Sequence, residues 1–356
     1  MQKILKIRKL LKSKKIEAIL IASSYNKFYL ANLYSGSGYV FVTKRSQYVI
    51  VDFRYYKQVK EDTKGFTVIE QTRANKLENI LNKIIHDEEI RTIGFEGDYI
   101  VYDAFSNLDT NLEAQLVPVS LEALRCLKST EEIHLIAEAA EITDKAFSHI
   151  LDYIQCGMSE KQVENELVRC IRECGGIKES FDIIVASGER GALPHGKASD
   201  KKICAGELVT IDFGVNLKHY CSDMTRTFAM GYVKDAKLVE IYEVVKRAQE
   251  EAIKQIRSGI RAGEIDAAAR SIIQAEGYGE YFGHNLGHGM GIMVHEYPAL
   301  CPDSSVILEA GMVVTVEPGI YIPQLGGVRI EDDILVTKEG AIPLTKSPRE
   351  LIIVKG

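Results

Sequence analysis

No segment of the sequence is long and apolar enough to cross a membrane, because none approaches the roughly 20 consecutive apolar residues that a spanning helix needs. The start of the chain also lacks the roughly 7–15-residue apolar run of a secretory signal. Lysines interrupt the apolar residues of positions 1–15, which predicts an amphipathic first helix packed on its own domain. A helix lying on a membrane surface is the alternative.

An excess of basic charge is also missing, since the formal net charge is -6. No overall positive field would attract nucleic acid, and we expect neither a nucleic-acid nor a membrane partner. The hydrophobic fraction of 46% and the charged fraction of 26% are ordinary for a soluble globular protein. The 356 residues are about right for two domains.

The seven cysteines are scattered, and none belongs to a Cys-x-x-Cys pair. This pattern argues against a disulfide framework and against a zinc ribbon. Cys170 and Cys174 lie four apart on a predicted helix and could share a metal, but reduced thiols are the simpler interpretation. We therefore expect a reducing compartment, the cytoplasm.

Residues 1–122 predict a small α/β domain, in which apolar runs alternate with helical patterns. Nothing in this stretch has catalytic spacing. The expected strands are 18–22, 39–43, 48–51 and 92–95, and the expected helices are 76–85 and 99–108.

Two capping boxes open the next part of the chain. Ser129 with Glu132 begins a helix with an apolar stripe, and Ser159 with Gln162 begins a second helix. The second helix is expected to end at Gly175–Gly176, where glycine supplies a left-handed cap.

The domain expected over residues 128–356 contains one plan twice. Segments 154–158 and 205–214 of the first copy correspond to 256–260 and 310–319 of the second. The period is too long for a solenoid and predicts an α+β domain with an internal pseudo-twofold repeat. Each copy presents an acidic residue at the same structural place, so a site between the halves would receive acids from both.

Two aspartates of the first copy are expected to approach each other. Asp212 ends an apolar strand, and a hairpin turn separates it from Asp223. A turn centred between Leu217 and Lys218 would place the aspartates directly opposite each other, with Cβ atoms roughly 4.5–5.5 Å apart. Ionised carboxylates so placed repel unless they share a proton or bind a cation. Two solvated loop aspartates are the alternative.

The second copy repeats the arrangement with Glu317 and Glu331, for which we expect proximity without a defined pairing. An acidic turn over 331–333 is the alternative. Four buried carboxylates are costly unless neutralised, and two divalent cations would balance them, most naturally manganese, with cobalt or zinc as alternatives. Four histidines in glycine-bearing stretches are assigned to the same site. These are His195, His284, His288 and His295.

Five motifs make the chain resemble the Xaa-Pro aminopeptidase and prolidase branch of the pita-bread metallopeptidases. In that family's order they are 209–214 (Val-Thr-Ile-Asp-Phe-Gly), 221–227 (Cys-Ser-Asp-Met-Thr-Arg-Thr), 287–291 (Gly-His-Gly-Met-Gly), 316–321 (Val-Glu-Pro-Gly-Ile-Tyr) and 328–333 (Val-Arg-Ile-Glu-Asp-Asp). The resemblance covers the whole chain. It implies a creatinase-like domain over 1–122 and a pita-bread catalytic domain over 128–356.

The resemblance also implies the site residues. The metal ligands would be Asp212, Asp223, His288, Glu317 and Glu331, with Asp223 and Glu331 bridging two ions. The catalytic residues would be His195, His295, Glu317 and Arg329, and the substrate-binding or supporting residues His284 and Tyr321. Glu317 would relay the proton of the attacking water. His295 would stabilise the oxyanion.

The resemblance implies a homodimeric exopeptidase that cleaves in front of proline. An Xaa-Pro aminopeptidase accepts longer peptides, whereas a prolidase must recognise the free carboxylate of a dipeptide, usually with a basic residue. Some prolidases carry an arginine shortly after the motif that reads His295-Glu-Tyr-Pro298 here, but Ala299 and Leu300 follow it. We therefore expect the aminopeptidase, with the prolidase as alternative.

Other pita-bread relatives fit less well. Creatinase works without metals and lacks the complete ligand set, and methionine aminopeptidases usually lack the N-terminal domain. Relatives that bind histones or RNA have generally lost ligands, so a non-catalytic binding module is the remote alternative.

Overall fold

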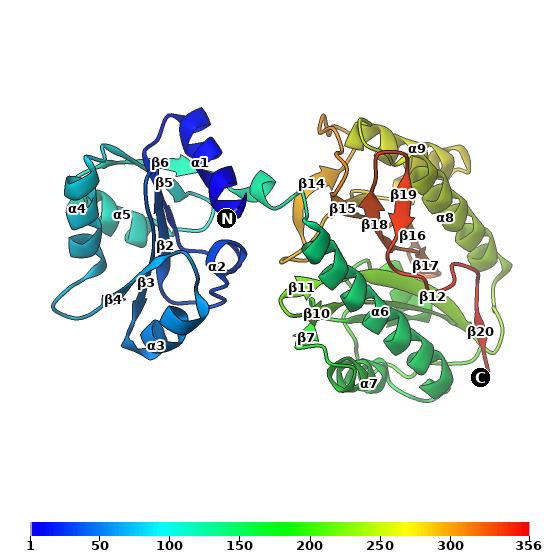
Figure 1. The fold of residues 1–356 in the computed structure, drawn as a ribbon. Coiled ribbons are helices and arrows are strands. Elements are labelled where there is room, and N and C mark those ends of the chain that lie inside the picture. The colour runs from blue at the N-terminus through cyan, green and yellow to red at the C-terminus, as the bar shows by residue number, and fades with distance from the viewer. Residues whose placement is uncertain (1, 356) are drawn as a thin grey trace. The chain divides into compact units, whose positions relative to one another are not determined.

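The structure, a computed structural model, describes residues 2–355 and divides by its contacts into two units, Met1–Arg125 and Cys126–Gly356 (Figure 1). We keep 1–122 and 128–356 as the proposed domain bounds. The outermost residues of those ranges, 1 and 356, lie outside the described part.

The first unit is built on a mixed six-stranded sheet in the order β4-β3-β2-β1-β5-β6. Its strands are β1 (Ala18–Ile21), β2 (Tyr39–Thr43), β3 (Gln47–Asp52), β4 (Thr67–Gln71), β5 (Thr92–Glu96) and β6 (Gln115–Val119). Its helices are α1 (Gln2–Lys14), α2 (Ser24–Ala31), α3 (Phe53–Asp62), α4 (Leu77–Glu88) and α5 (Tyr102–Asn111). The expected α/β class is confirmed, as are the four expected strands and two expected helices.

The sequence patterns did not indicate α2, α3, β4 and β6. β6 contains Pro118 and lies at the edge of the sheet, where a missing N–H is tolerated. The first helix, α1, buries Ile4, Ile7 and Leu11 at helical spacing. Its apolar face is therefore packed on its own unit, which confirms the amphipathic interpretation.

The second unit contains two α+β halves. The first has α6 (Thr130–Tyr153), α7 (Glu160–Glu173), β7 (Lys178–Glu179), β8 (Ile184–Ser187), β9 (Leu208–Phe213), β10 (Val215–Leu217), β11 (Tyr220–Cys221) and β12 (Met224–Met230). The second has α8 (Ala236–Gln255), α9 (Ala262–Ala275), β13 (Gly287–Gly289), β14 (Glu296–Leu300), β15 (Val313–Val316), β16 (Gly319–Ile322), β17 (Gly326–Arg329), β18 (Asp332–Val336), β19 (Ala341–Pro343) and β20 (Ile353–Val354).

Each half packs a helix pair on its own strands, green in the first half and yellow to red in the second (Figure 1). The two larger sheets run β20-β12-β9-β8 and β14-β13-β15-β18-β19, and the first of them takes in β20 from the end of the chain. The smaller sheets are β11-β10-β7 and β16-β17. Both capping boxes are confirmed, because the Ser129 and Ser159 hydroxyls accept hydrogen bonds from the N–H groups of Glu132 and Gln162, whose side chains accept from the serine N–H groups. Gly175 has the expected positive φ. The pita-bread class with its internal repeat is confirmed.

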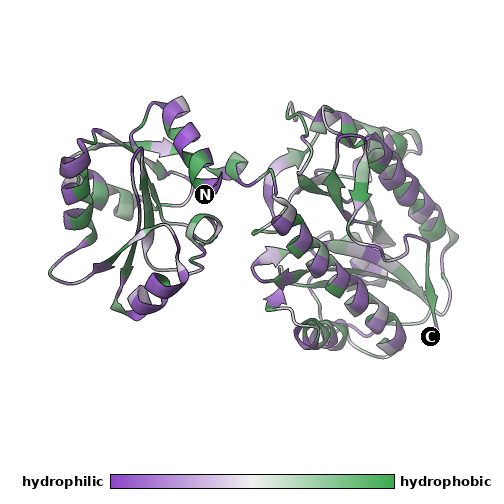
Figure 2. Ribbon diagram, viewed as in Figure 1, coloured by the Kyte–Doolittle hydropathy of each residue, from purple (hydrophilic) through white to green (hydrophobic). Residues whose placement is uncertain are grey.

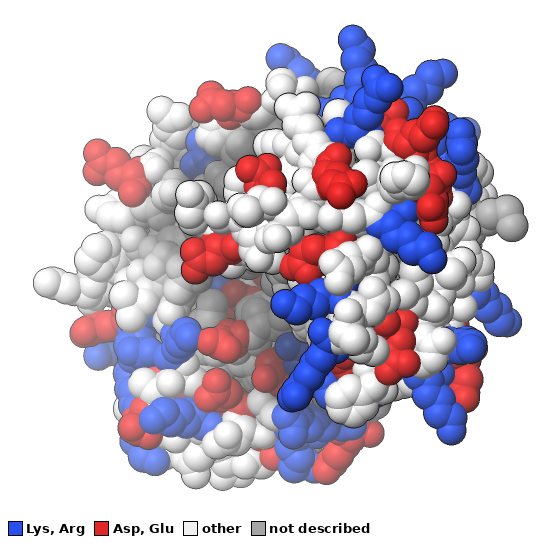
Figure 3. Space-filling model, turned by 90° about the vertical axis from the view of Figure 1, so that its left-hand side faces the viewer, with Lys and Arg blue, Asp and Glu red and all other residues white. Residues whose placement is uncertain are grey.

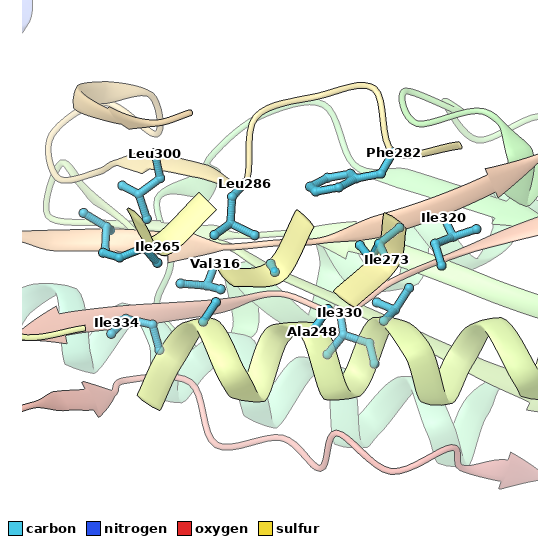
Figure 4. Close-up of a cluster of buried hydrophobic side chains, with 14 of the residues drawn as sticks. Ala248, Ile265, Ile273, Phe282, Leu286, Leu300, Val316, Ile320, Ile330 and Ile334 are labelled. Carbon is cyan, nitrogen blue, oxygen red and sulfur yellow. The ribbon is translucent and has the colours of Figure 1, made fainter. Parts of the chain in front are cut away.

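The core of the second half joins the two helices to the site-bearing strands. Ile265 and Ile273 of α9 and Ala248 of α8 meet Val316 and Ile330, the neighbours of two of the predicted metal ligands (Figure 4). The helices carry alternating hydrophobic and hydrophilic faces (Figure 2). Apolar packing therefore fixes the strand ends that carry the acids.

On the face drawn in Figure 3, acidic and basic side chains are intermingled. Among the described residues, no helix has both the length and the apolar character needed to span a membrane.

Candidate metal centre

One cavity of about 700 Å³ in the second unit brings together side chains from both halves. All ten residues predicted for the site line it: His195, Asp212, Asp223, His284, His288, His295, Glu317, Tyr321, Arg329 and Glu331. The cavity wall also includes residues that were not assigned to the site from the sequence, although Gly287 opens one of the five motifs. These are Phe181, Asp182, Ile184, Pro194, Lys197, Asn285 and Gly287.

The first hairpin differs from the predicted register. Its turn residues, Lys218 and His219, have φ of 49° and 70°, and the Asn216 side chain accepts a hydrogen bond from the His219 N–H. The turn is therefore centred one residue later than expected, and Asp212 faces Thr225. The direct Asp212–Asp223 pairing was wrong. Moving the turn centre by one residue moves the partner of Asp212 by two, from Asp223 to Thr225. Residues two apart on a strand share a face, so both aspartates still point to one face.

The second hairpin has one register on both sides of an interruption. Val316 pairs with Asp332 before it and Gly319 with Arg329 after it. Glu317 and Glu331 thus stand opposite each other where the ladder is broken. The two acids direct their backbone N–H groups elsewhere, to the carbonyls of Leu286 and Thr225. The proximity expected of these glutamates is present.

The halves meet where the chain at Asp223 runs beside the chain at Glu331. The Thr225 carbonyl accepts a hydrogen bond from the Glu331 N–H at 3.1 Å. The Thr225 hydroxyl donates to Glu331 Oε2 at 2.6 Å, and the Asp223 N–H donates to Asp333 Oδ2 at 3.0 Å. These contacts bring acids from the two copies into one cluster.

Three of the predicted ligands, Asp223, His288 and Glu331, each offer a ligand atom, and these atoms all lie within 4.8 Å of one another. His288 Nε2 lies 3.3 Å from Glu317 Oε1 and 3.8 Å from Asp223 Oδ2. Asp212 adjoins the cluster, with one oxygen held by Arg329 at 2.6 Å. This geometry can accommodate cations among the five side chains.

The acids are buried and incompletely satisfied. Asp223 is 4% exposed and Glu331 is 1% exposed. Within the described chain, one oxygen each of Asp212, Asp223 and Glu331 has no hydrogen-bond partner. Burial, followed by repulsion from neighbouring carboxylates, raises the pKa of Asp223 and of Glu331 well above their ordinary values. A bound cation would relieve both penalties. The alternatives of solvated loop aspartates and an exposed acidic turn are wrong.

Glycines make room for His288. A Cβ on Gly287 would lie 2.1 Å from the Thr315 carbonyl oxygen, and one on Gly289 would lie 2.4 Å from that of Tyr297. Only glycine therefore lets β13 pass between its neighbours with the imidazole directed into the cavity. Burial opposes a charge on His288, but the hydrogen bond and charge of Glu317 outweigh it and raise the pKa of the imidazole.

A hydrogen-bonded chain supports Asp212 from behind. Arg329 donates to Asp212 Oδ2 at 2.6 Å and to the Tyr321 hydroxyl at 2.8 Å. The Tyr321 oxygen lies 2.9 Å from His284 Nε2, and His284 Nδ1 lies 2.7 Å from the Asn285 carbonyl. Because a carbonyl only accepts, Nδ1 carries the proton and Tyr321 donates to Nε2. Burial lowers the pKa of His284, which favours this neutral form.

His195 and His295 occupy the exposed side of the cavity. The His295 ring lies 4.4 Å from the His288 ring, edge to face. Burial and then the neighbouring His288 lower the pKa of His295. The Pro194 carbonyl accepts a hydrogen bond from Arg329 at 3.2 Å, which holds the residue before His195 against the site.

Three supporting residues were missed from the sequence. Thr225 donates to Glu331, Thr315 donates to Glu317 at 3.2 Å, and Asp333 accepts from the Asp223 N–H. All three lie in or beside the motifs, two residues from a predicted ligand. Period-two alternation along a strand would have identified Thr225 and Thr315 as sharing a face with the acids.

Glu160 organises the loop that carries His195. It is fully buried at the start of α7, and its carboxylate accepts five hydrogen bonds, from the backbone and hydroxyl groups of Ser187 and Ser199 and from Arg190 Nε. Ser187 precedes the His195 loop in the chain, and Ser199 follows it. The sequence offered no signal, because an acid in a first helical turn is common.

We expect Glu160→Gln to lower the free energy of unfolding by about 3 kcal/mol, since an amide cannot accept from all five donors. Activity should fall several-fold through misplacement of His195. Urea unfolding and kcat/KM measure the two effects. Glu173→Gln, which breaks an exposed pair on the same helix, is the control. Equal behaviour of the two variants would contradict the assigned role.

Comparison with known families decides the class. The model of metallopeptidase family M24 matches residues 134–338, and the creatinase/prolidase N-terminal domain matches residues 3–127. The chain belongs to metallopeptidase family M24. The resemblance stated from the sequence motifs is therefore confirmed. The expectation that the protein is a metallopeptidase is confirmed as well.

Individual relatives of this M24 peptidase span its full length. An Xaa-Pro dipeptidase of Pyrococcus horikoshii is 40% identical over 99% of both chains. A solved Xaa-Pro dipeptidase from Bacillus anthracis is 45% identical with a TM-score of 0.96 over 99% of both chains. A solved X-Pro aminopeptidase from Thermotoga maritima is 34% identical with a TM-score of 0.90, also over 99% of both.

Proposed function

We propose that the protein is a dinuclear-metal Xaa-Pro dipeptidase that hydrolyses the bond in front of proline in dipeptides. The observation that carries the proposal is the buried cluster of Asp223, His288 and Glu331, whose ligand atoms converge and whose acids keep oxygens without a partner in the described chain. The dipeptidases of Pyrococcus horikoshii and Bacillus anthracis, 40% and 45% identical, support the dipeptide substrate.

The cluster fits two divalent cations by its donor chemistry. The five side chains that would hold them are Asp212, Asp223, His288, Glu317 and Glu331. Four carboxylates and one imidazole suit Mn²⁺, with Co²⁺ or Zn²⁺ as alternatives. When bound, such cations would polarise a carbonyl oxygen and lower the pKa of a bound water.

The chain's own groups would then move the proton and hold the substrate. Burial disfavours a charge on Glu317, but the hydrogen bond and charge of His288 outweigh it and lower the pKa of the carboxyl. An ionised Glu317 can accept the proton of the attacking water. His195 and His295, at the open side, can donate hydrogen bonds to the oxyanion. Arg329 keeps Asp212 in place and makes no contact with substrate in this scheme.

The dipeptidase replaces the aminopeptidase that we expected from the sequence. That expectation depended on Ala299 and Leu300, where some prolidases have an arginine. The missing arginine is weak support for an aminopeptidase, because three similar proteins that match over nearly the full length are Xaa-Pro dipeptidases. A homodimer and a cytoplasmic location remain part of the proposal, supported by the family resemblance and by the scattered free cysteines.

We expect manganese-supplemented protein to cleave Ala-Pro at least about tenfold faster, in kcat/KM, than Ala-Pro-Ala, because one charge-assisted contact to the carboxylate is lost in the tripeptide. EDTA should abolish both activities. Faster cleavage of the tripeptide would restore the aminopeptidase. Absence of EDTA-sensitive cleavage of either peptide would overturn the peptidase proposal itself.

A further inference from the structure

A dipeptide that ends in proline carries its carboxylate one residue beyond the scissile bond. Consecutive Cα atoms lie roughly 3.8 Å apart, so the group that binds this carboxylate must stand close to the cations. Among the described residues that line the cavity, the lysine and arginine side chains are those of Lys197 and Arg329. Arg329 is buried and already donates to Asp212, Tyr321, Pro194 and Thr225. It therefore has little capacity left for a substrate.

Lys197 stands in the same row of residues as Asp212. Ile184 pairs with Asp212 on one side and forms an antiparallel bridge with Lys197 on the other, and Asp212 pairs with Thr225. Directly opposed residues of antiparallel strands direct their side chains to one face. With roughly 4.8 Å between neighbouring strands, the backbone of Lys197 lies roughly 10 Å from that of Asp212. The four-carbon side chain of Lys197 is long enough to bring its ammonium group to the carboxylate of a dipeptide bound beside Asp212.

Lys197 already holds a carboxylate. Its ammonium lies 2.5 Å from Asp182 Oδ2, and the two side chains are 72% and 76% exposed. An ion pair so exposed contributes little to stability, so a substrate carboxylate can replace that of Asp182 at small cost. The Lys197 backbone is fixed independently, because its carbonyl accepts from Arg190 at 2.6 Å and its residue bridges to Ile184.

We propose that Lys197 is the specificity-determining residue that binds the C-terminal carboxylate of the dipeptide, and that Asp182 holds the ammonium group until the substrate arrives. This inference rests on the proposed Xaa-Pro dipeptidase function. It supplies, from a different strand, the basic group that is missing after Pro298. Because the contact is made by the ground state and the transition state alike, its loss should appear mainly in KM.

The test compares Ala-Pro with its C-terminal amide, Ala-Pro-NH2, on the manganese-loaded full-length protein. For wild type we expect kcat/KM to favour the acid. In Lys197→Met the ratio of the two kcat/KM values should fall about tenfold, with KM for Ala-Pro rising about as much and kcat changing less than about twofold. Lys197→Arg should keep most of the preference, and Asp182→Asn should lower KM for Ala-Pro.

Lys161→Met is the matched control, because Lys161 forms a similar exposed pair with Asp200 outside the cavity. It should leave the acid-to-amide ratio as in wild type. If wild type prefers the acid and Lys197→Met keeps that preference, the role of Lys197 is refuted while the dipeptidase stands. If wild type cleaves neither compound, or shows no preference for the acid, the failure lies with the proposed dipeptidase function.

Discussion

Replacing Glu331 by glutamine is expected to raise the melting temperature of the metal-free protein and to abolish the activity of the manganese-supplemented protein. Glu331 is 1% exposed, and one of its oxygens has no partner in the described chain. Removing one of several crowded buried acids relieves desolvation and repulsion, by roughly 1–2 kcal/mol, or a few degrees in Tm. The same change removes one of the proposed metal ligands, so activity should fall on the order of a thousandfold or more.

The gain in Tm should depend on pH. Burial, then repulsion by Glu317 and Asp212, raises the pKa of Glu331 well above its ordinary value. Between the two values the folded state holds a proton that the unfolded state has released, so the stability of metal-free wild type falls as pH rises. Glutamine has no such proton. The advantage of the variant should therefore be small near pH 4 and grow towards neutral pH.

Differential scanning fluorimetry with and without Mn²⁺ separates the two effects. Wild type should gain about 2.7 kcal/mol at a metal concentration one hundred times Kd, and Glu331→Gln should gain much less. Glu276→Gln, in an exposed pair with Arg247, is the control and should match wild type in both respects. A variant less stable than wild type without metal, yet still stabilised by Mn²⁺, would show that Glu331 is a structural acid and not a ligand.

Local rules predicted those parts of the fold whose chemistry is contained in a few neighbouring residues. Ser129 with Glu132 is such a case, since both hydrogen bonds of the capping box are present. The internal repeat predicted that acids of two distant segments would meet, and Asp223 and Glu331 do so through Thr225. Their roles as ligands stay predictions.

The features that the sequence did not predict depend on contacts and turn geometry that no local pattern encodes. The turn at Lys218 and His219 has positive φ at both positions without a glycine or asparagine in either, so no turn residue indicated its centre. Lys197 reaches the cavity only because Ile184 lies between it and Asp212, a pairing that no motif encodes. Glu160 acts on a loop whose contacting residues lie 27 to 39 positions further along the chain.

Replacing Arg329 by methionine should have the opposite effect to Glu331→Gln on the metal-free protein. The guanidinium is 4% exposed and donates to Asp212, to the Tyr321 hydroxyl and to the Pro194 carbonyl. Its loss leaves Asp212 buried without a cation. Breaking such a pair costs about 3–5 kcal/mol, and activity should fall at least about a hundredfold, because Asp212 and the His195 loop lose a common support.

Metal and arginine supply positive charge to the same acids, so their contributions should depend on each other. Without Arg329, Asp212 repels Glu317 and Glu331 with nothing to offset it, and Mn²⁺ should raise the Tm of Arg329→Met by more than it raises that of wild type. Arg349→Met is the control, because Arg349 pairs with buried Asp332, which keeps Arg226 as a second partner. If Arg329→Met unfolds like wild type without metal, the guanidinium does not compensate the acids, and the charge balance inferred for the cluster is wrong.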